Sequence, residues 1–178
     1  YSSKKNILVG HSMGSLICLS IVINKLFNAQ KVVLIGVSYP MKVSRSLLNL
    51  SKENTSEAIL NMINWSLPSA SKLRGSHLIG LNLPNFINTI MYKTENNLFL
   101  DLNACNKYTV DDLELKKIEN SILIIAGKLD IMTPIKNSYL LNSILKNSSI
   151  ETIENCGHFH IHERSDNVRK LINNYIES

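Results

Sequence analysis

Three side chains with complementary chemistry lie far apart in the 178-residue sequence: Ser12, Asp130 and His158. A serine hydroxyl is a weak nucleophile near neutral pH. It needs a base to take its proton, and the base needs an acid to orient it. The serine lies within Gly10-His11-Ser12-Met13-Gly14, a G-x-S-x-G pentapeptide. The chain order of serine, acid and histidine indicates nucleophilic catalysis on an acyl group.

The setting of the pentapeptide favours a nucleophile elbow, a sharp turn between a strand and a helix. An apolar run precedes it at residues 6–9, and an apolar stretch long enough for a helix follows at residues 13–27. The two glycines would let backbones pass where a Cβ would collide, and the helix N-terminus would stabilise negative charge beside Ser12. A plain glycine-rich strand–helix turn is the alternative. His11 is expected to be a structural hydrogen-bonding residue, not a second base.

The order of the predicted elements indicates an α/β fold with a parallel sheet flanked by helices. Strands are predicted at residues 6–9, 31–37, 121–126 and 149–153, and helices at residues 13–27, 135–145 and 166–176. Asp130 and His158 follow the third and fourth strands, so both are expected at the same sheet edge as Ser12. Residues 41–100 contain helical patterns at 44–50, 56–65 and 84–92 and no convincing strand. They predict a helical insertion over one end of the sheet.

Together these motifs resemble the α/β-hydrolase family, in its serine hydrolase or esterase-like members, from about Asn6 to the C-terminus. The segments that carry the resemblance are Ile7-Leu8-Val9-Gly10-His11-Ser12-Met13-Gly14, Ile124-Ile125-Ala126-Gly127 with Asp130 and Thr133-Pro134, Gly157-His158 with Glu163, and Asp101-Leu102-Asn103-Ala104-Cys105 with Tyr108. The resemblance implies a partial α/β-hydrolase fold with a core of residues 1–40 and 101–178. Residues 41–100 would be the helical lid, which shapes substrate choice.

The resemblance also implies roles for single residues. Ser12 would be the nucleophile, Asp130 the acid and His158 the base, and the Met13 N–H would support the oxyanion. The implied activity is serine hydrolysis of an ester-like acyl substrate through an acyl-enzyme, without a cofactor or a metal. Thioester cleavage, carbon–carbon bond hydrolysis and acyl transfer use the same triad and remain alternatives. A non-catalytic ligand-binding protein and an inactive truncated member are further alternatives.

Other acidic residues have simpler interpretations. The segment after the second strand, residues 37–40, holds no carboxylate, so it offers no rival to Asp130 as the acid. Glu163 and Asp166 flank the proposed base. They are expected to be charges at the start of the last helix, where the helix dipole favours them.

A metal site is conceivable at His158, His160 and His162, which alternate and would share one face of an extended segment. No cluster of cysteine or carboxylate completes a ligand set there, so metal binding is disfavoured. Cys156, next to the base, is expected to be buried packing and not a redox group.

The composition excludes several other functions. The formal net charge is +5, but the basic residues are dispersed and aromatic residues make up only 6% of the chain, so nucleic-acid binding is not expected. No apolar run approaches the ~20 residues of a membrane-spanning helix, and no signal peptide is evident. Three widely spaced cysteines suit a reducing compartment. We therefore expect a cytoplasmic protein acting on a small molecule.

The start of the sequence leads to two further expectations. Only eleven residues precede Ser12, so the chain is expected to be the C-terminal part of a longer hydrolase that lacks the early strands. The early loop that supplies a second oxyanion donor would also be missing. The first strand would then present an unpaired apolar edge, which favours self-association.

Overall fold

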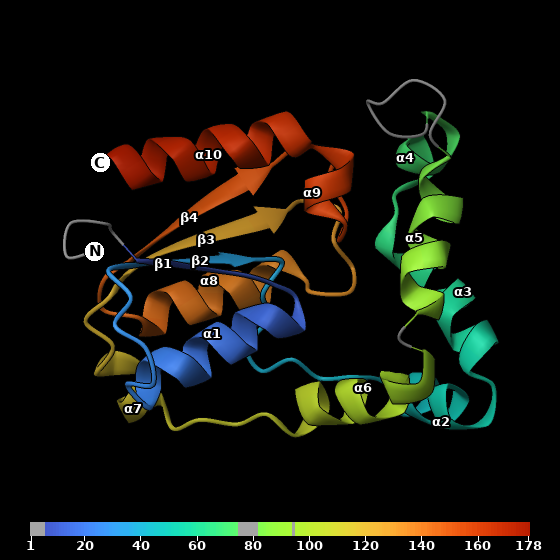
Figure 1. The fold of residues 1–178 in the computed structure, drawn as a ribbon, viewed down its shortest axis with the longest axis horizontal. Helices are drawn as coiled ribbons and strands as arrows, with labels where there is room; N and C mark the ends of the chain where they lie inside the picture. Colours follow the sequence, from blue (N-terminus) through green and yellow to red (C-terminus); the bar gives the residue numbers. More distant parts are fainter. Residues whose placement is uncertain (1–5, 75–81, 94) are drawn as a thin grey trace.

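Four parallel strands form one sheet in the computed structural model, which describes residues 6–74, 82–93 and 95–178 (Figure 1). The strands are β1 (Ile7–His11), β2 (Lys31–Ile35), β3 (Ser121–Gly127) and β4 (Ser148–Ile153), in the order β1-β2-β3-β4 across the sheet. All three pairings are parallel, so the carboxyl ends of the strands lie at one edge. Residues 75–81 and 94 of the predicted insertion and residues 1–5 of the predicted core lie outside the described residues.

Alternating apolar side chains of the central strands fill both sides of the sheet. Val32 and Ile124 pack in a cluster with residues of α1 (Met13–Ile23) and α8 (Ile135–Ile144). Val33 and Ile125 point the opposite way and pack against α10 (Ser165–Glu177). Strands that are buried on both faces read as continuous apolar runs, as the central two do here. The packed sheet therefore fixes the position of the loops that follow the carboxyl ends of its strands.

A group of helices, the cap helices, occupies residues 45–107 between β2 and β3. Its members are α2 (Arg45–Glu53), α3 (Thr55–Ser66), α4 (Ser69–Arg74), α5 (Leu83–Tyr92), the short 3₁₀ helix η1 (Glu95–Asn97) and α6 (Leu98–Lys107). The side chains of Ser44, Asn54 and Asn82 accept hydrogen bonds from the first turns of α2, α3 and α5, which fixes where those helices begin. The cap helices bury their own apolar cluster, separate from the two clusters of the sheet. In Figure 1, α3, α4 and α5 stand beyond the carboxyl ends of the strands.

The predicted α/β class and the four parallel strands are confirmed, but several helices differ from prediction. The helix after Ser12 ends at Ile23 and not at residue 27, because Lys25 turns with φ 53° and leaves Leu26 exposed. Among the described residues, four α-helices lie outside the predicted set: α4, α6, α7 (Asp112–Lys116) and α9 (His160–Glu163). The predicted boundary between residues 100 and 101 falls inside α6.

β1 lies at one end of the strand order, so it has a neighbour on one side only among the described strands. Val9 on this strand is 51% exposed, and Ile17 on the adjoining α1 is 49% exposed. Across the described helices, no segment combines the length and the apolar character needed to cross a membrane.

Candidate active site

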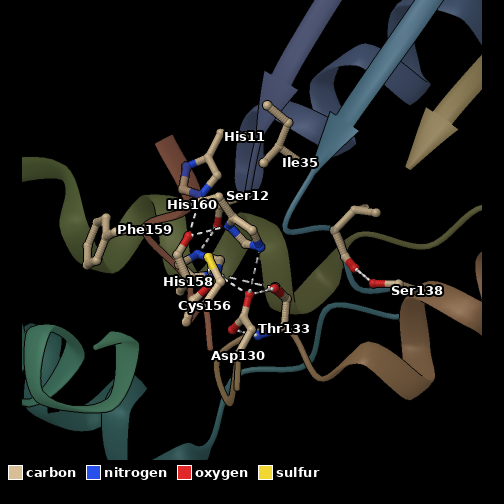
Figure 2. Close-up of polar contacts among 12 residues, drawn as sticks. His11, Ser12, Ile35, Asp130, Thr133, Ser138, Cys156, His158, Phe159 and His160 are labelled. Atoms are coloured by element: carbon tan, nitrogen blue, oxygen red, sulfur yellow. Dashed lines mark hydrogen bonds and ion pairs between the residues drawn. The ribbon is translucent and has the colours of Figure 1, made fainter. Parts of the chain in front are cut away.

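The turn that carries Ser12 joins β1 directly to α1 (Figure 2). Ser12 has φ 54° and ψ −119°, a backbone conformation that residues with a Cβ rarely adopt. Its N–H donates a hydrogen bond to the Ile35 carbonyl oxygen at 2.9 Å, which ties the turn to β2. Met13 is the first residue of α1, so its N–H belongs to the turn whose amides lack acceptors within the helix. The arrangement is the strand–turn–helix geometry that the pentapeptide predicts.

The two glycines of the pentapeptide have different roles. A Cβ added at Gly10 would lie 2.3 Å from the Gly14 carbonyl oxygen, so only glycine fits there. A Cβ added at Gly14 would meet nothing within 4 Å. The expectation that both glycines avoid a collision is therefore wrong for Gly14, because its carbonyl and not its Cα faces Gly10. The buried Ser15 hydroxyl also fastens the turn, by donating to the Gly10 carbonyl oxygen at 2.9 Å.

The structure brings the three predicted site residues together at the carboxyl edge of the sheet (Figure 2). The Ser12 hydroxyl lies 2.9 Å from His158 Nε2, and His158 Nδ1 lies 2.8 Å from Asp130 Oδ2. The carboxylate accepts the Nδ1 hydrogen, so Nε2 of a neutral imidazole is bare and can accept the serine proton. The Asp130 side chain is 1% exposed and that of His158 is 8% exposed, so the contacts are shielded from water.

Thr133 also holds the Asp130 carboxylate, and its hydroxyl lies 3.2 Å from His158 Nδ1. Its N–H donates to Oδ1 at 2.8 Å and its hydroxyl donates to Oδ2 at 2.5 Å. Burial alone would raise the pKa of Asp130, but the hydrogen bonds and charge of His158 and the two bonds from Thr133 outweigh it and lower the pKa. The carboxylate therefore stays charged and keeps its orientation. The sequence motif contains Thr133 but does not by itself show this role; the spacing of three residues from Asp130 is the signal that points to it.

Two further imidazoles surround His158. His11 Nε2 lies 2.8 Å and His160 Nδ1 lies 2.7 Å from the His158 carbonyl oxygen, and each must donate because a carbonyl only accepts. Burial is the main cause that lowers the pKa of His11 to about 3 and that of His160 to about 4, so both are neutral near pH 7. His160 Nε2 lies 4.0 Å from Asp130 Oδ2 and has no hydrogen-bond partner among the described residues. His11 thus has the structural role that the sequence predicts.

Glu163 is buried at the end of α9, and its predicted place at the start of the last helix is wrong. Its carboxylate accepts the N–H groups of Gly157 at 3.1 Å and of Phe159 at 3.2 Å, and the Ser71 hydroxyl at 2.6 Å. Burial raises the pKa of Glu163, while these hydrogen bonds act in the opposite direction. The short helix α9 explains the difference, because it turns the side chain back toward the loop. Asp166 does lie in the first turn of α10, as predicted.

The three alternating histidines do not share a face. α9 begins at His160, so the segment is not extended, and the His162 ring lies 5.4 Å from that of Phe86. In the described part of the chain, no group of three or more His, Cys, Asp or Glu side chains is arranged to hold a metal ion. Cys156 is fully buried, and burial raises its pKa to about 12, which leaves an inert thiol.

A cavity of about 280 Å³ opens beside Ser12 and His158, under the cap helices. Its apolar walls include Leu47, Met62, Trp65, Leu102, Ile131 and Met132. A larger hollow of about 670 Å³ lies at the other end of the strands, between the end of α1 and the start of β3, and is lined by lysines. That hollow contains none of the site residues, so the chemistry belongs to the smaller, apolar cavity.

Comparison with known proteins identifies similar sequences and structures. The family model for the alpha/beta hydrolase fold matches residues 1–165. The monoacylglycerol lipase ABHD6 of Mus musculus is 33% identical over 82 residues, which cover 46% of this chain and 24% of the lipase. The match therefore spans about a quarter of that relative.

Two solved esterase structures have a similar fold. A thermophilic esterase superposes with a TM-score of 0.82 at 19% identity, covering 99% of this chain and 67% of the esterase. An esterase from Exiguobacterium antarcticum gives a TM-score of 0.81 at 18% identity, covering 98% of this chain and 68% of the esterase. The chain therefore corresponds to about two thirds of these structures, which makes its fold a partial one.

Proposed function

The chain belongs to the alpha/beta hydrolase fold family, and from this membership and the site geometry we propose that it is a serine hydrolase that cleaves ester-like acyl bonds. The single observation that carries the proposal is the continuous hydrogen-bonded series from Ser12 through His158 to Asp130, buried at the mouth of an apolar cavity. Such a series has the components of nucleophilic acyl transfer: a nucleophile, its base and the group that orients the base.

The proposed reaction has two halves. Ser12 Oγ attacks the substrate carbonyl while its proton passes to His158 Nε2, and the negative charge of Asp130 stabilises the imidazolium. The Met13 N–H, at the positive end of α1, donates to the developing oxyanion. His158 then gives the proton to the leaving alcohol, which leaves an acyl-enzyme on Ser12. A water molecule, deprotonated by His158, attacks the acyl-enzyme and releases the acid and the free serine.

The walls of the cavity indicate the substrate class. An aliphatic and aromatic lining beside Ser12 and His158 favours an apolar acyl or alcohol group, since burial of apolar surface contributes about 25 cal/mol per Å². An ester is favoured over a thioester or a carbon–carbon bond because the relative with the sequence match is a lipase. We further propose that the cap helices act as a lid, since α2, α3 and α6 supply most of the apolar lining. The three free, buried cysteines support a place in a reducing cytoplasm.

Covalent labelling tests the proposal. A fluorophosphonate reacts with activated serines, so we expect stoichiometric labelling of the wild-type protein and none of Ser12→Ala. Ser143→Ala is the matched control, because Ser143 is exposed on α8, away from the site. Equal labelling of Ser12→Ala and the wild type would refute the assignment of the nucleophile.

A further inference from the structure

The loop that carries His158 is held by the Ser66 carbonyl and the Glu163 carboxylate, and neither group forms a hydrogen bond with the Ser12 hydroxyl. The His158 N–H donates to the carbonyl oxygen of Ser66, the last residue of α3, at 2.8 Å. The N–H groups on either side, those of Gly157 and Phe159, donate to the Glu163 carboxylate. Three consecutive amides around the proposed base thus have acceptors outside their own loop backbone. Their orientation is set by Ser66 and Glu163.

The turn between α3 and α4 supplies or supports both acceptors. The α3–α4 turn is here the corner of residues 66–71, from the last residue of α3 into the first turn of α4. Besides the Ser66 carbonyl, this corner presents the Ser71 hydroxyl, which donates to Glu163 Oε2 at 2.6 Å. Ser66, Ser71 and Glu163 are 1%, 5% and 2% exposed, so water cannot easily replace these bonds. A charged carboxylate that is buried with three donors is strongly oriented by them. If the turn moved away, the Glu163 carboxylate would lose the Ser71 hydroxyl as a donor, and the His158 backbone N–H would lose the Ser66 carbonyl as its acceptor.

The fit between the turn and the loop is close. A Cβ added at Gly157 would lie 2.2 Å from the Ser66 carbonyl oxygen and 2.5 Å from Pro68 Cδ. Phe159 packs against the apolar cluster of the cap helices. The loop therefore contacts the cap helices through backbone, side chain and apolar surface together, although it follows a strand of the sheet.

We propose that the α3–α4 turn is a positioning element for the proposed base: docking of the cap helices places His158, and Ser71 and Glu163 transmit the docking. This inference rests on the proposed function in that His158 is taken as the base. The cap helices have their own apolar cluster, so the α3–α4 turn belongs to a packing unit distinct from the two clusters of the sheet. Displacement of the turn would misplace the imidazole as well as open the cavity. Access of substrate and readiness of the base would then depend on the same movement.

A positioning role can be separated from a role in binding. None of Ser66, Ser71 and Glu163 lines the cavity beside Ser12. Ser66 acts through its backbone carbonyl, so the side chains to change are Ser71 and Glu163. Substitution of either should slow the chemical step and leave affinity for a ligand unchanged. A wall residue would show the reverse pattern.

The test uses Ser71→Ala and Glu163→Gln, with Ser69→Ala and Glu177→Gln as matched controls at exposed positions. Amide hydrogen exchange at residues 157–159 should become at least about tenfold faster in the two test variants. Ser71→Ala removes a donor that orients the Glu163 side chain, and Glu163→Gln weakens the acceptor of the Gly157 and Phe159 amides. Exchange at β3 should stay unchanged in all four variants, which shows that the sheet remains folded. In fluorophosphonate labelling, the maximal rate should fall by about tenfold with the half-saturating concentration unchanged.

Unchanged exchange at residues 157–159 in Ser71→Ala would overturn the proposal. So would labelling in which the half-saturating concentration rises and the maximal rate does not fall. Amide exchange does not depend on catalysis. It therefore tests whether the α3–α4 turn holds residues 157–159 even if the wild-type protein fails to label. A failure to label would count against the proposed function alone. Ser71→Ala removes a single hydroxyl outside the loop and keeps the test valid if Glu163→Gln fails to fold.

Discussion

The turn at Ser12 and the loop at His158 meet at one site but are held in different ways. The Ser12 turn depends on the sheet: its amide bonds to β2, and Gly10 and Ser15 fasten it to its own helix within five residues. The His158 loop depends on distant parts of the chain, namely Ser66 and Ser71 of the cap helices, together with Glu163. The nucleophile is therefore held by the sheet and its own helix, whereas the base is held in part by the cap helices.

This difference separates two kinds of perturbation. A change at the Ser12 turn should damage folding, because the turn is part of the sheet core. A change near the His158 loop should chiefly alter the placement of the base.

Gly10→Ala should be severely destabilising. Its Cβ would lie 2.3 Å from backbone atoms that cannot move without shifting α1, so we expect a loss of about 3–5 kcal/mol in the free energy of unfolding. Gly14→Ala should change the free energy of unfolding by less than about 0.5 kcal/mol, because its Cβ meets nothing. Urea unfolding followed by circular dichroism measures both. Similar losses in the two variants would contradict the different roles given to the glycines.

His160→Asn should flatten the dependence of stability on pH. The pKa of His160 is about 4 in the folded protein, below the ordinary histidine value of 6.5, so between these values the unfolded chain binds a proton that the folded protein does not. The contribution of neutral, buried His160 to stability is thus fully present above pH 6.5, the pKa in the unfolded chain, and it falls as the pH decreases toward 4. For this one group, the loss between pH 7 and pH 5 is about 2 kcal/mol. Asparagine retains a donor toward the His158 carbonyl but does not titrate, so urea midpoints at the two pH values should differ less than in the wild type.

An unchanged pH dependence in His160→Asn would show that His160 does not enter the low-pH loss of stability. The loss of stability at low pH would then have to come from other groups that bind protons on unfolding.

The smallest expected effect is a change in self-association on substitution in the edge strand β1. β1 lies at one end of the strand order with Val9 half-exposed, and we propose that this apolar edge pairs with a second copy. Val9→Lys should shift the protein toward monomer in size-exclusion chromatography, because a charge on an edge strand opposes pairing. A wild-type protein that elutes as a stable monomer at high concentration would refute the proposal.

The sequence predicted what depends on local pattern and missed what depends on distant contact. The parallel strands and the elbow were predictable, because apolar runs and a pentapeptide carry them within a few residues. The roles of Glu163 and His160 were not, since a short helix of four residues, α9, decides where their side chains point. Helix α6 was also missed, because it begins inside the predicted lid, ends in the predicted core and has a weak apolar pattern. The contacts that hold the His158 loop could not be predicted from the sequence, because they depend on how the cap helices pack against it.

The most direct test of the account is to trap the covalent intermediate. The protein is mixed with p-nitrophenyl acetate, quenched in acid within the first turnover and digested for mass spectrometry. The account predicts an acetyl group on the peptide that contains Ser12, with its amount reduced in Asp130→Asn and His158→Gln. Acetylation at another residue, or ester turnover that persists in Ser12→Ala, would contradict the central claim.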